Sequence, residues 1–189
     1  GLMQLEHRPP LGYSPGGTVN DVASSLGLSR DPVVAAQDIV HCKPFAIDIG
    51  AFGENRWFDY VAAFGLFTNV PYQTPQVDKR IWGRMAYFFN GVQALGEVHP
   101  VHARVSWAGK TVEADIIDGL VCSTTSVGGF KATRAVGEFG ISMNDGLYEV
   151  VLIRDIKNLA DFSAVAAKLL WMDFSDENYF ITAQTSAIR

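Results

Sequence analysis

The stretch SPGGTVND, at residues 14–21, contains the residue types of a phosphate-binding turn. Gly16 and Gly17 leave room for a ligand to approach the backbone, and Thr18 stands at the start of a predicted helix. Backbone N–H groups at a helix start carry partial positive charge, which suits a phosphate. The same pattern also describes an ordinary turn, in which Thr18 is the N-cap of the helix and Asp21 its reciprocal partner. The carboxylate of Asp21 would oppose an anion unless hydroxyl, amide or cationic groups intervened.

A second candidate is the pair Asp145 and Gly146, which directly precedes a predicted buried strand. Locally this pair indicates a hairpin turn. A carboxylate beside exposed carbonyls is also suited to Mg²⁺, which takes a few protein oxygens plus water. The spacing of His99 and His102 suggests a metal pair only weakly, because the proline between them works against a helix that would align both imidazoles.

Composition restricts the class of protein. The chain has 15 basic and 20 acidic residues, and its net charge of −5 argues against binding to a nucleic-acid backbone. Hydrophobic residues make up 48% of the chain, enough for a packed core, and no apolar stretch approaches the roughly 18 residues of a bilayer span. Cys42 and Cys122 are expected to be buried thiols of a cytoplasmic protein. The motifs of serine hydrolases and P-loop proteins are absent.

Strands outnumber helices in the predicted element order, which favours a mainly β (α+β) fold: an antiparallel β-sandwich with two flanking helices. The last helix, with Asn158 as N-cap, is expected to turn an apolar side inward. Those inward positions are Leu159, Phe162, Val165, Ala166 and Leu169. The predicted helices are 19–26, 79–95 and the segment after Asn158, and the predicted strands are 39–49, 56–64, 101–107, 110–117, 119–125, 147–154 and 178–188.

Five segments occur in a characteristic order. The most specific is PLGYSPGGTVNDVASSLGL at 10–28, with the pattern P-x-G-T-x-N-D. Together the segments resemble the bacterial diacylglycerol kinase family of soluble lipid kinases, which are related to sphingosine kinases and more distantly to NAD kinases. The other four are FDYVAAFGLFTNVPYQTP at 58–75, RIWGRMAYFFNGVQAL at 80–95, SVGGF at 126–130 and MNDGLYEVVLI at 143–153.

The resemblance implies a kinase with two domains and an active site in the cleft between them. Residues 1–38 would be a remnant of the α/β nucleotide domain, and residues 39–189 the β-sandwich domain on the lipid side. Thr18 matches the threonine that contacts ATP in the family. The residues that would shape the phosphate side of the cleft are Gly16, Gly17, Asn20 and Asp21.

The resemblance also implies a structural Mg²⁺ site. Asp145 matches the family's aspartate ligand, and Leu147 would contribute its backbone carbonyl. Ser142 stands where the family has a lysine, so the sequence departs from the pattern at this site.

Two motifs of the family are not present in these 189 residues. They are a G-G-D-G-T loop before the turn and a D-G-E motif after the last strand, whose acid would be the general base. The chain is therefore expected to be an inactive central fragment, with the base beyond Arg189. The full-length parent would transfer the γ-phosphoryl group of ATP to diacylglycerol, making phosphatidic acid, with Mg²⁺ as cofactor.

The expected partners are a diacylglycerol-like lipid, transiently the inner face of the membrane, and a second copy of the chain in a homodimer; nucleic acid is not expected. Two alternatives stay open: a non-catalytic module for lipid binding or dimerisation, and a kinase whose acceptor is a sphingoid base, a glycolipid or NAD. Lys79, Arg80 and Arg84 are candidates for anionic headgroups or for a solvated basic turn. Aromatic residues that suit either an acyl-chain groove or the core are Phe64, Phe67, Tyr72, Trp82, Tyr87, Phe88 and Phe89.

Overall fold

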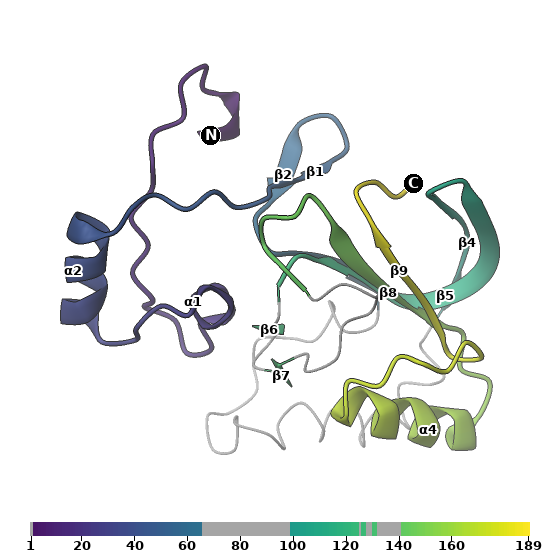
Figure 1. Cartoon of the computed structure of the whole chain (residues 1–189). Helices are drawn as coiled ribbons and strands as arrows, with labels where there is room; N and C mark the ends of the chain where they lie inside the picture. The colour runs from purple at the N-terminus through teal and green to yellow at the C-terminus, as the bar shows by residue number, and fades with distance from the viewer. Residues whose placement is uncertain (1, 66–98, 125, 128–129, 132–140) are drawn as a thin grey trace.

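The computed structural model describes residues 2–65, 99–124, 126–127, 130–131 and 141–189. An antiparallel sheet forms the centre, and two helices near the N-terminus lie to one side of it (Figure 1). Among the described residues, no helix is both long enough and apolar enough to cross a membrane. The mainly β (α+β) class predicted from the sequence is confirmed.

The sheet has five strands, ordered β3-β5-β8-β9, and β4 also pairs with β5. Ile116 of β5 faces Val101 of β4 on one side and Arg154 of β8 on the other, so β3 and β4 share one edge of β5. The chain end returns to β4, where Ser106 and Arg189 exchange two backbone hydrogen bonds of 2.7 and 3.0 Å. The strands are β3 (Val61–Gly65), β4 (Val101–Trp107), β5 (Lys110–Cys122), β8 (Tyr148–Arg154) and β9 (Phe180–Thr185).

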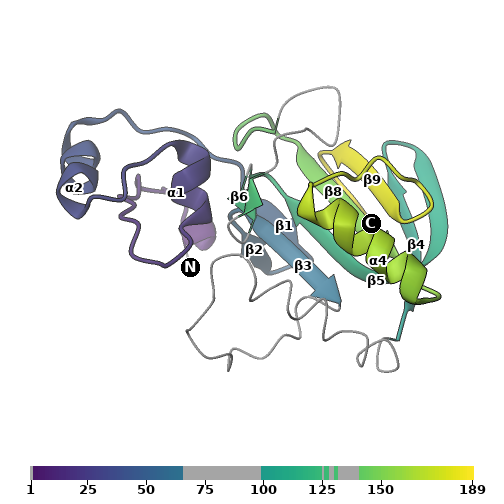
Figure 2. The ribbon, with the colours of Figure 1, turned by 90° about the horizontal axis from the view of Figure 1, so that it is seen from below.

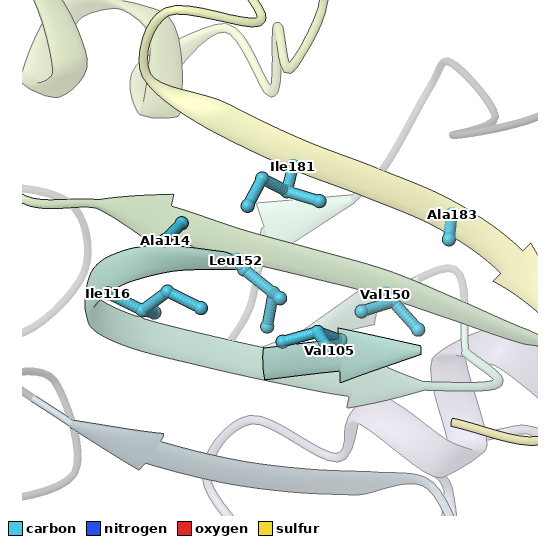
Figure 3. Packing of buried hydrophobic residues seen from close by; sticks show 7 residues of the cluster. All are labelled: Val105, Ala114, Ile116, Val150, Leu152, Ile181 and Ala183. Atoms are coloured by element: carbon cyan, nitrogen blue, oxygen red, sulfur yellow. The ribbon is translucent and has the colours of Figure 1, made fainter. Parts of the chain in front are cut away.

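Both faces of the sheet are apolar, because successive side chains of β8 alternate between two core clusters. Val150 and Leu152 belong to the cluster in Figure 3, where side chains from β4, β5, β8 and β9 converge. Val151 and Ile153 belong to the other cluster, which α4 (Leu159–Leu170) covers, as Figure 2 shows. The first cluster consists of Val105, Ala114, Ile116, Val150, Leu152, Ile181 and Ala183.

The predicted strands 110–117 and 119–125 form one strand, β5, with an irregularity between Ile116 and Asp118. Ile116 faces the first cluster and Ile117 the second, as neighbours in a regular strand do. Beyond the irregularity the alternation has shifted by one residue, so the odd-numbered Val121 packs against the first cluster. A long central strand therefore contributes to both cores.

The last helix agrees with its sequence pattern except at its first residue. The Asn158 side chain caps α4 by accepting a hydrogen bond of 2.9 Å from the backbone N–H of Asp161. Phe162, Val165 and Ala166 are buried, as predicted, and Leu169 packs against the second cluster. The inward placement of Leu159 was wrong, because its side chain is 54% exposed. The other predicted flanking helix, 79–95, lies outside the described residues.

The predicted strand 39–49 was wrong, because α2 (Pro32–His41) occupies the beginning of that range. Asp31 caps this helix, and its Oδ1 accepts hydrogen bonds from the N–H groups of Val33 (2.8 Å) and Val34 (3.1 Å). Pro32 at the first helical position reinforces the start. The hairpin expected here is confined to β1 (Gly50–Phe52) and β2 (Arg56–Phe58). The domain boundary proposed at 38/39 falls inside α2.

The two cysteines differ. Cys122 is buried, as predicted, and burial raises the pKa of its thiol to about 12, with a smaller contribution from Glu149. Cys42 follows α2 directly and is exposed, so its predicted burial was wrong.

Candidate functional site

The glycine turn is closed by Asn20 and not by Thr18. The backbone N–H of Gly17 donates to Asn20 Oδ1 (2.8 Å), and Asn20 Nδ2 donates to the carbonyl of Gly17 (2.6 Å). α1 (Asp21–Leu26) starts after Asn20, whose left-handed backbone (φ 58°, ψ 51°) makes no side-chain cap. The N-cap role predicted for Thr18 was therefore wrong. Asparagine tolerates this left-handed conformation better than threonine does, because its short side-chain amide can form hydrogen bonds to the nearby backbone.

This arrangement leaves Gly16 and Thr18 as the open part of the turn. Both residues are exposed, and a Cβ added to Gly16 would meet nothing within 4 Å. A Cβ on Gly17 would lie 3.0 Å from Asn20 Oδ1, so the reciprocal bonds favour glycine there. Asp21 is buried, at 9% exposure, in the first turn of a helix of only six residues. A helix this short adds little to anion binding, so the exposed turn itself has to supply the donors.

The second candidate site is the turn at Asp145 and Gly146. Asp145 Oδ1 accepts a hydrogen bond from the N–H of Leu147 (3.0 Å), and Gly146 takes a positive φ of 74°. Asp48 holds the turn at two points: its N–H donates to the carbonyl of Met143 (2.7 Å), and its Oδ2 accepts from the N–H of Gly146 (2.8 Å). The sequence pattern does not indicate a role for Asp48, which lies in the predicted strand 39–49.

Acidic side chains lie near this turn. Glu149 is 1% exposed; Gln184 donates to its Oε1 (3.0 Å), and its Oε2 has no hydrogen-bond partner among the described residues. Burial raises the pKa of the Glu149 carboxyl, and Asp145 adds to the rise. Burial, and then Asp48, raises the pKa of Tyr148. A cation near these carboxyl groups would be electrostatically favoured.

The donor chemistry of the turn suits a hard cation such as Mg²⁺, since carboxylate and carbonyl oxygens are its usual protein ligands. Asp145 and the carbonyl of Leu147 are the predicted ligands. Ser142, in the position of the family lysine, donates to Asn144 Oδ1 (2.7 Å) and so belongs to the loop itself. No group of three or more His, Cys, Asp or Glu side chains suited to a metal occurs within the described ranges, so water would have to complete the shell.

The remaining candidates divide into surface residues and residues outside the described ranges. His102 pairs with Asp115 Oδ1 (2.8 Å) across the exposed side of β4 and β5. Phe64 is 46% exposed on β3. Candidates outside the described residues are Phe67, Tyr72, Lys79, Arg80, Trp82, Arg84, Tyr87, Phe88 and Phe89.

The structure brings Gly17 and Asn20 together in one turn, and Asp145 and Leu147 in another. The elements that carry the two turns are connected through β5. Ser25 of α1 hydrogen bonds Thr124, just past the end of β5. Further along, β5 pairs with β8, which begins directly after the Asp145 turn.

Replacing Asp48 with alanine is expected to lower the free energy of unfolding by about 1–3 kcal/mol, because the N–H of Gly146 loses its acceptor. Asp48→Asn, which keeps an acceptor oxygen, should lose less. Urea denaturation measures both, with Glu54→Ala at the exposed β1–β2 turn as the matched loss of a carboxylate. Equal effects of Asp48→Ala and Glu54→Ala would show that Asp48 does not hold the loop.

Comparisons with known proteins find similar sequences and a similar fold among proteins named diacylglycerol kinase. The family described as "Diacylglycerol kinase catalytic domain" matches residues 1–52. The chain is 30% identical over 190 residues to diacylglycerol kinase of Bacillus subtilis, covering the whole chain and 61% of that protein. It is 30% identical over 165 residues to diacylglycerol kinase of Staphylococcus aureus (strain JH9), covering 87% of the chain and 50% of that protein.

A solved structure described as a diacylglycerol kinase from Bacillus anthracis has a TM-score of 0.65 at 19% identity, and the match covers 99% of this chain and 57% of that one. This likeness shows the shared fold. The chain thus spans about half to three fifths of the length of these relatives. Its sequence matches thus make the chain similar to the diacylglycerol kinase family, over residues 1–52 in the family model and over the whole chain in the Bacillus subtilis relative.

Proposed function

We propose that the whole protein transfers the γ-phosphoryl group of ATP to the hydroxyl of diacylglycerol and so forms phosphatidic acid. The observation that carries this proposal is the exposed Gly16–Thr18 turn, tied back by Asn20, inside the segment that matches the kinase family. Relatives named diacylglycerol kinase support the choice of lipid.

Each residue of the turn has a proposed part in holding ATP. The Thr18 hydroxyl donates to a phosphate oxygen, and Gly16 lets the phosphate chain approach the backbone. Gly17 and Asn20 fix the shape of the turn through their reciprocal bonds. Asp21 is buried and supports the start of α1. Phosphoryl transfer depends on positioning and on charge stabilisation, so such a turn contributes by fixing the ATP phosphates before the hydroxyl attacks.

The proposed cofactors are ATP, as phosphoryl donor, and Mg²⁺. Asp145 and the Leu147 carbonyl would hold a structural Mg²⁺, and Asp48 would keep the turn in shape for it. Bound there, the ion supplies positive charge that offsets the surrounding carboxylates. The general base is assigned to no residue of this chain.

The proposed substrate is a membrane lipid, so we place the protein transiently at the inner face of the membrane, as a peripheral protein. An exposed Phe52 ring lies under the guanidinium of Arg56, with its centroid 4.8 Å from Cζ, and an aromatic–cation pair of this kind suits a headgroup region. The proposed assembly is a homodimer, which light scattering on the purified protein tests.

Thr18→Ala is expected to raise the KM for ATP about tenfold, the loss of roughly one hydrogen bond to a charged oxygen. Stability should change by less than about 0.5 kcal/mol, because Thr18 is exposed and does not cap α1. Steady-state kinetics and thermal melting measure the two quantities, with Thr111→Ala on the exposed face of β5 as control. An unchanged KM with a lower melting temperature would indicate a structural role for Thr18 and oppose the proposal.

A further inference from the structure

Arg30 reaches back to the glycine turn from the loop between α1 and α2. Its Nη2 donates a hydrogen bond of 2.9 Å to the carbonyl of Val19, next to Asn20. The side chain is exposed, and this bond places the guanidinium beside the turn proposed to hold phosphate.

The loop that carries Arg30 is fixed at both ends. At the end of α1, Gly27 takes a positive φ of 67°, and the N–H of Leu28 returns to the carbonyl of Ala23 (2.8 Å). At the start of α2, the N–H of Asp31 donates to Ser29 Oγ (3.1 Å) while the Asp31 side chain caps the helix. Arg30 therefore projects from a short connection whose backbone both helix ends define.

The charge of Arg30 is not neutralised by an ion pair within the part of the chain that the structure describes. Its neighbour Asp31 uses Oδ1 for the N–H groups of Val33 and Val34. The bond to Val19 uses a single N–H of a planar fork that offers several. The other donors have the geometry that suits phosphate oxygens.

A polyphosphate bound at this turn would need a positively charged group nearby. The N–H of Gly17 is already bonded to Asn20, Asp21 adds a carboxylate, and α1 is too short to contribute much positive potential. We propose that Arg30 binds the polyphosphate chain of the nucleotide at the Gly16–Asn20 turn. This inference rests on the proposed function and adds to it the residue that supplies the positive charge.

The test is an NMR titration of the ¹⁵N-labelled chain with inorganic tripolyphosphate, ATP and adenosine, because NMR detects even millimolar binding. The Arg30 Nε–Hε signal and the amides of Gly16 and Thr18 report on the turn. The variants are Arg30→Ala and Arg30→Lys. Arg104→Ala is the control: it removes the same charge from the exposed surface of β4, where Arg104 pairs with Glu113.

Tripolyphosphate and ATP should shift the Arg30 and turn signals saturably in the wild type and in Arg104→Ala. Arg30→Ala should raise both dissociation constants about tenfold or more, and Arg30→Lys less, since lysine keeps the charge but loses the fork. Adenosine, which lacks phosphate, should bind the wild type and Arg30→Ala alike. This last comparison separates phosphate binding by Arg30 from a structural effect of its bond to Val19.

Equal ATP affinity of the wild type and Arg30→Ala would overturn the role of Arg30 and leave the proposed kinase function standing. Absence of any shift with tripolyphosphate or ATP would also overturn it. If short-chain phosphatidic acid shifts the Arg30 signal more than tripolyphosphate at equal concentration, Arg30 belongs to the lipid side and the nucleotide assignment is wrong. Tripolyphosphate binding that depends on Arg30, in a protein that transfers no phosphoryl group, would support the anion site and refute the kinase proposal alone.

Discussion

Replacing Phe180 with alanine is expected to lower the free energy of unfolding by about 3–5 kcal/mol, the usual cost of removing a fully buried aromatic side chain. Phe180 begins β9 and is 2% exposed. It lies in the second core cluster, where Val165 of α4 also packs, and its ring meets Phe174 edge to face, with centroids 5.4 Å apart. The substitution therefore leaves a cavity where α4 covers the sheet.

Trp171→Ala is the matched control, because Trp171 is another large aromatic side chain but is 82% exposed. Its loss should change stability by less than about 0.5 kcal/mol. Urea denaturation of the two variants gives the comparison. If Phe180→Ala were no more damaging than Trp171→Ala, the packing of α4 on this face of the sheet would be wrong.

Gly65→Ala is expected to cost about 3 kcal/mol or more, because backbone strain and a steric clash act together. Gly65 ends β3 with a φ of 102°, which a residue with a Cβ rarely adopts. An added Cβ would lie 2.3 Å from the carbonyl oxygen of Ile117 and 2.6 Å from the Cα of Asp118. Gly65 and Asp118 are also register partners, so relief would require β3 and β5 to separate.

Gly109→Ala is the control that separates backbone strain from steric clash, because only the strain applies at Gly109. Gly109, in the turn between β4 and β5, has a φ of 78° but nothing within 4 Å of an added Cβ. Its substitution should cost only about 1 kcal/mol. Chemical denaturation should therefore show a much larger loss in the free energy of unfolding for Gly65→Ala than for Gly109→Ala. Similar losses for both would contradict the close approach of β3 to β5.

Elements whose local pattern agrees with their tertiary setting could be predicted from the sequence. The apolar spacing after Asn158 predicts α4, and the apolar run before Arg154 predicts β8. In both, the same residues that give the pattern also make the core, so local preference and burial favour one answer.

α2 could not be predicted in this way, because its β-branched residues favour a strand. Val33 and Val40 are 64% and 74% exposed, so packing of their side chains in a core does not favour a strand over a helix here. The start signal of Asp31 followed by Pro32 is the better local evidence, and the Asp31 cap outweighs strand propensity.

The candidate site was predictable only in part. The glycine turn stands out in the sequence, but Thr18 and Asn20 are both residues that often cap helices, and composition does not reveal which one closes the turn. Asp48 has no local signal at all, because its partner Gly146 is 98 residues away and only the folded chain brings them together. Arg30 likewise becomes a candidate only through its bond to Val19.

The measurement that tests the central claim most directly is transfer of labelled γ-phosphate from ATP by the whole protein that contains this chain. Diacylglycerol in mixed micelles, sphingosine and NAD are offered as acceptors in parallel reactions. We expect labelled phosphatidic acid as the main product. Label found only on NAD or on sphingosine, or on no acceptor while the protein is folded and binds ATP, would contradict the assignment of diacylglycerol kinase activity.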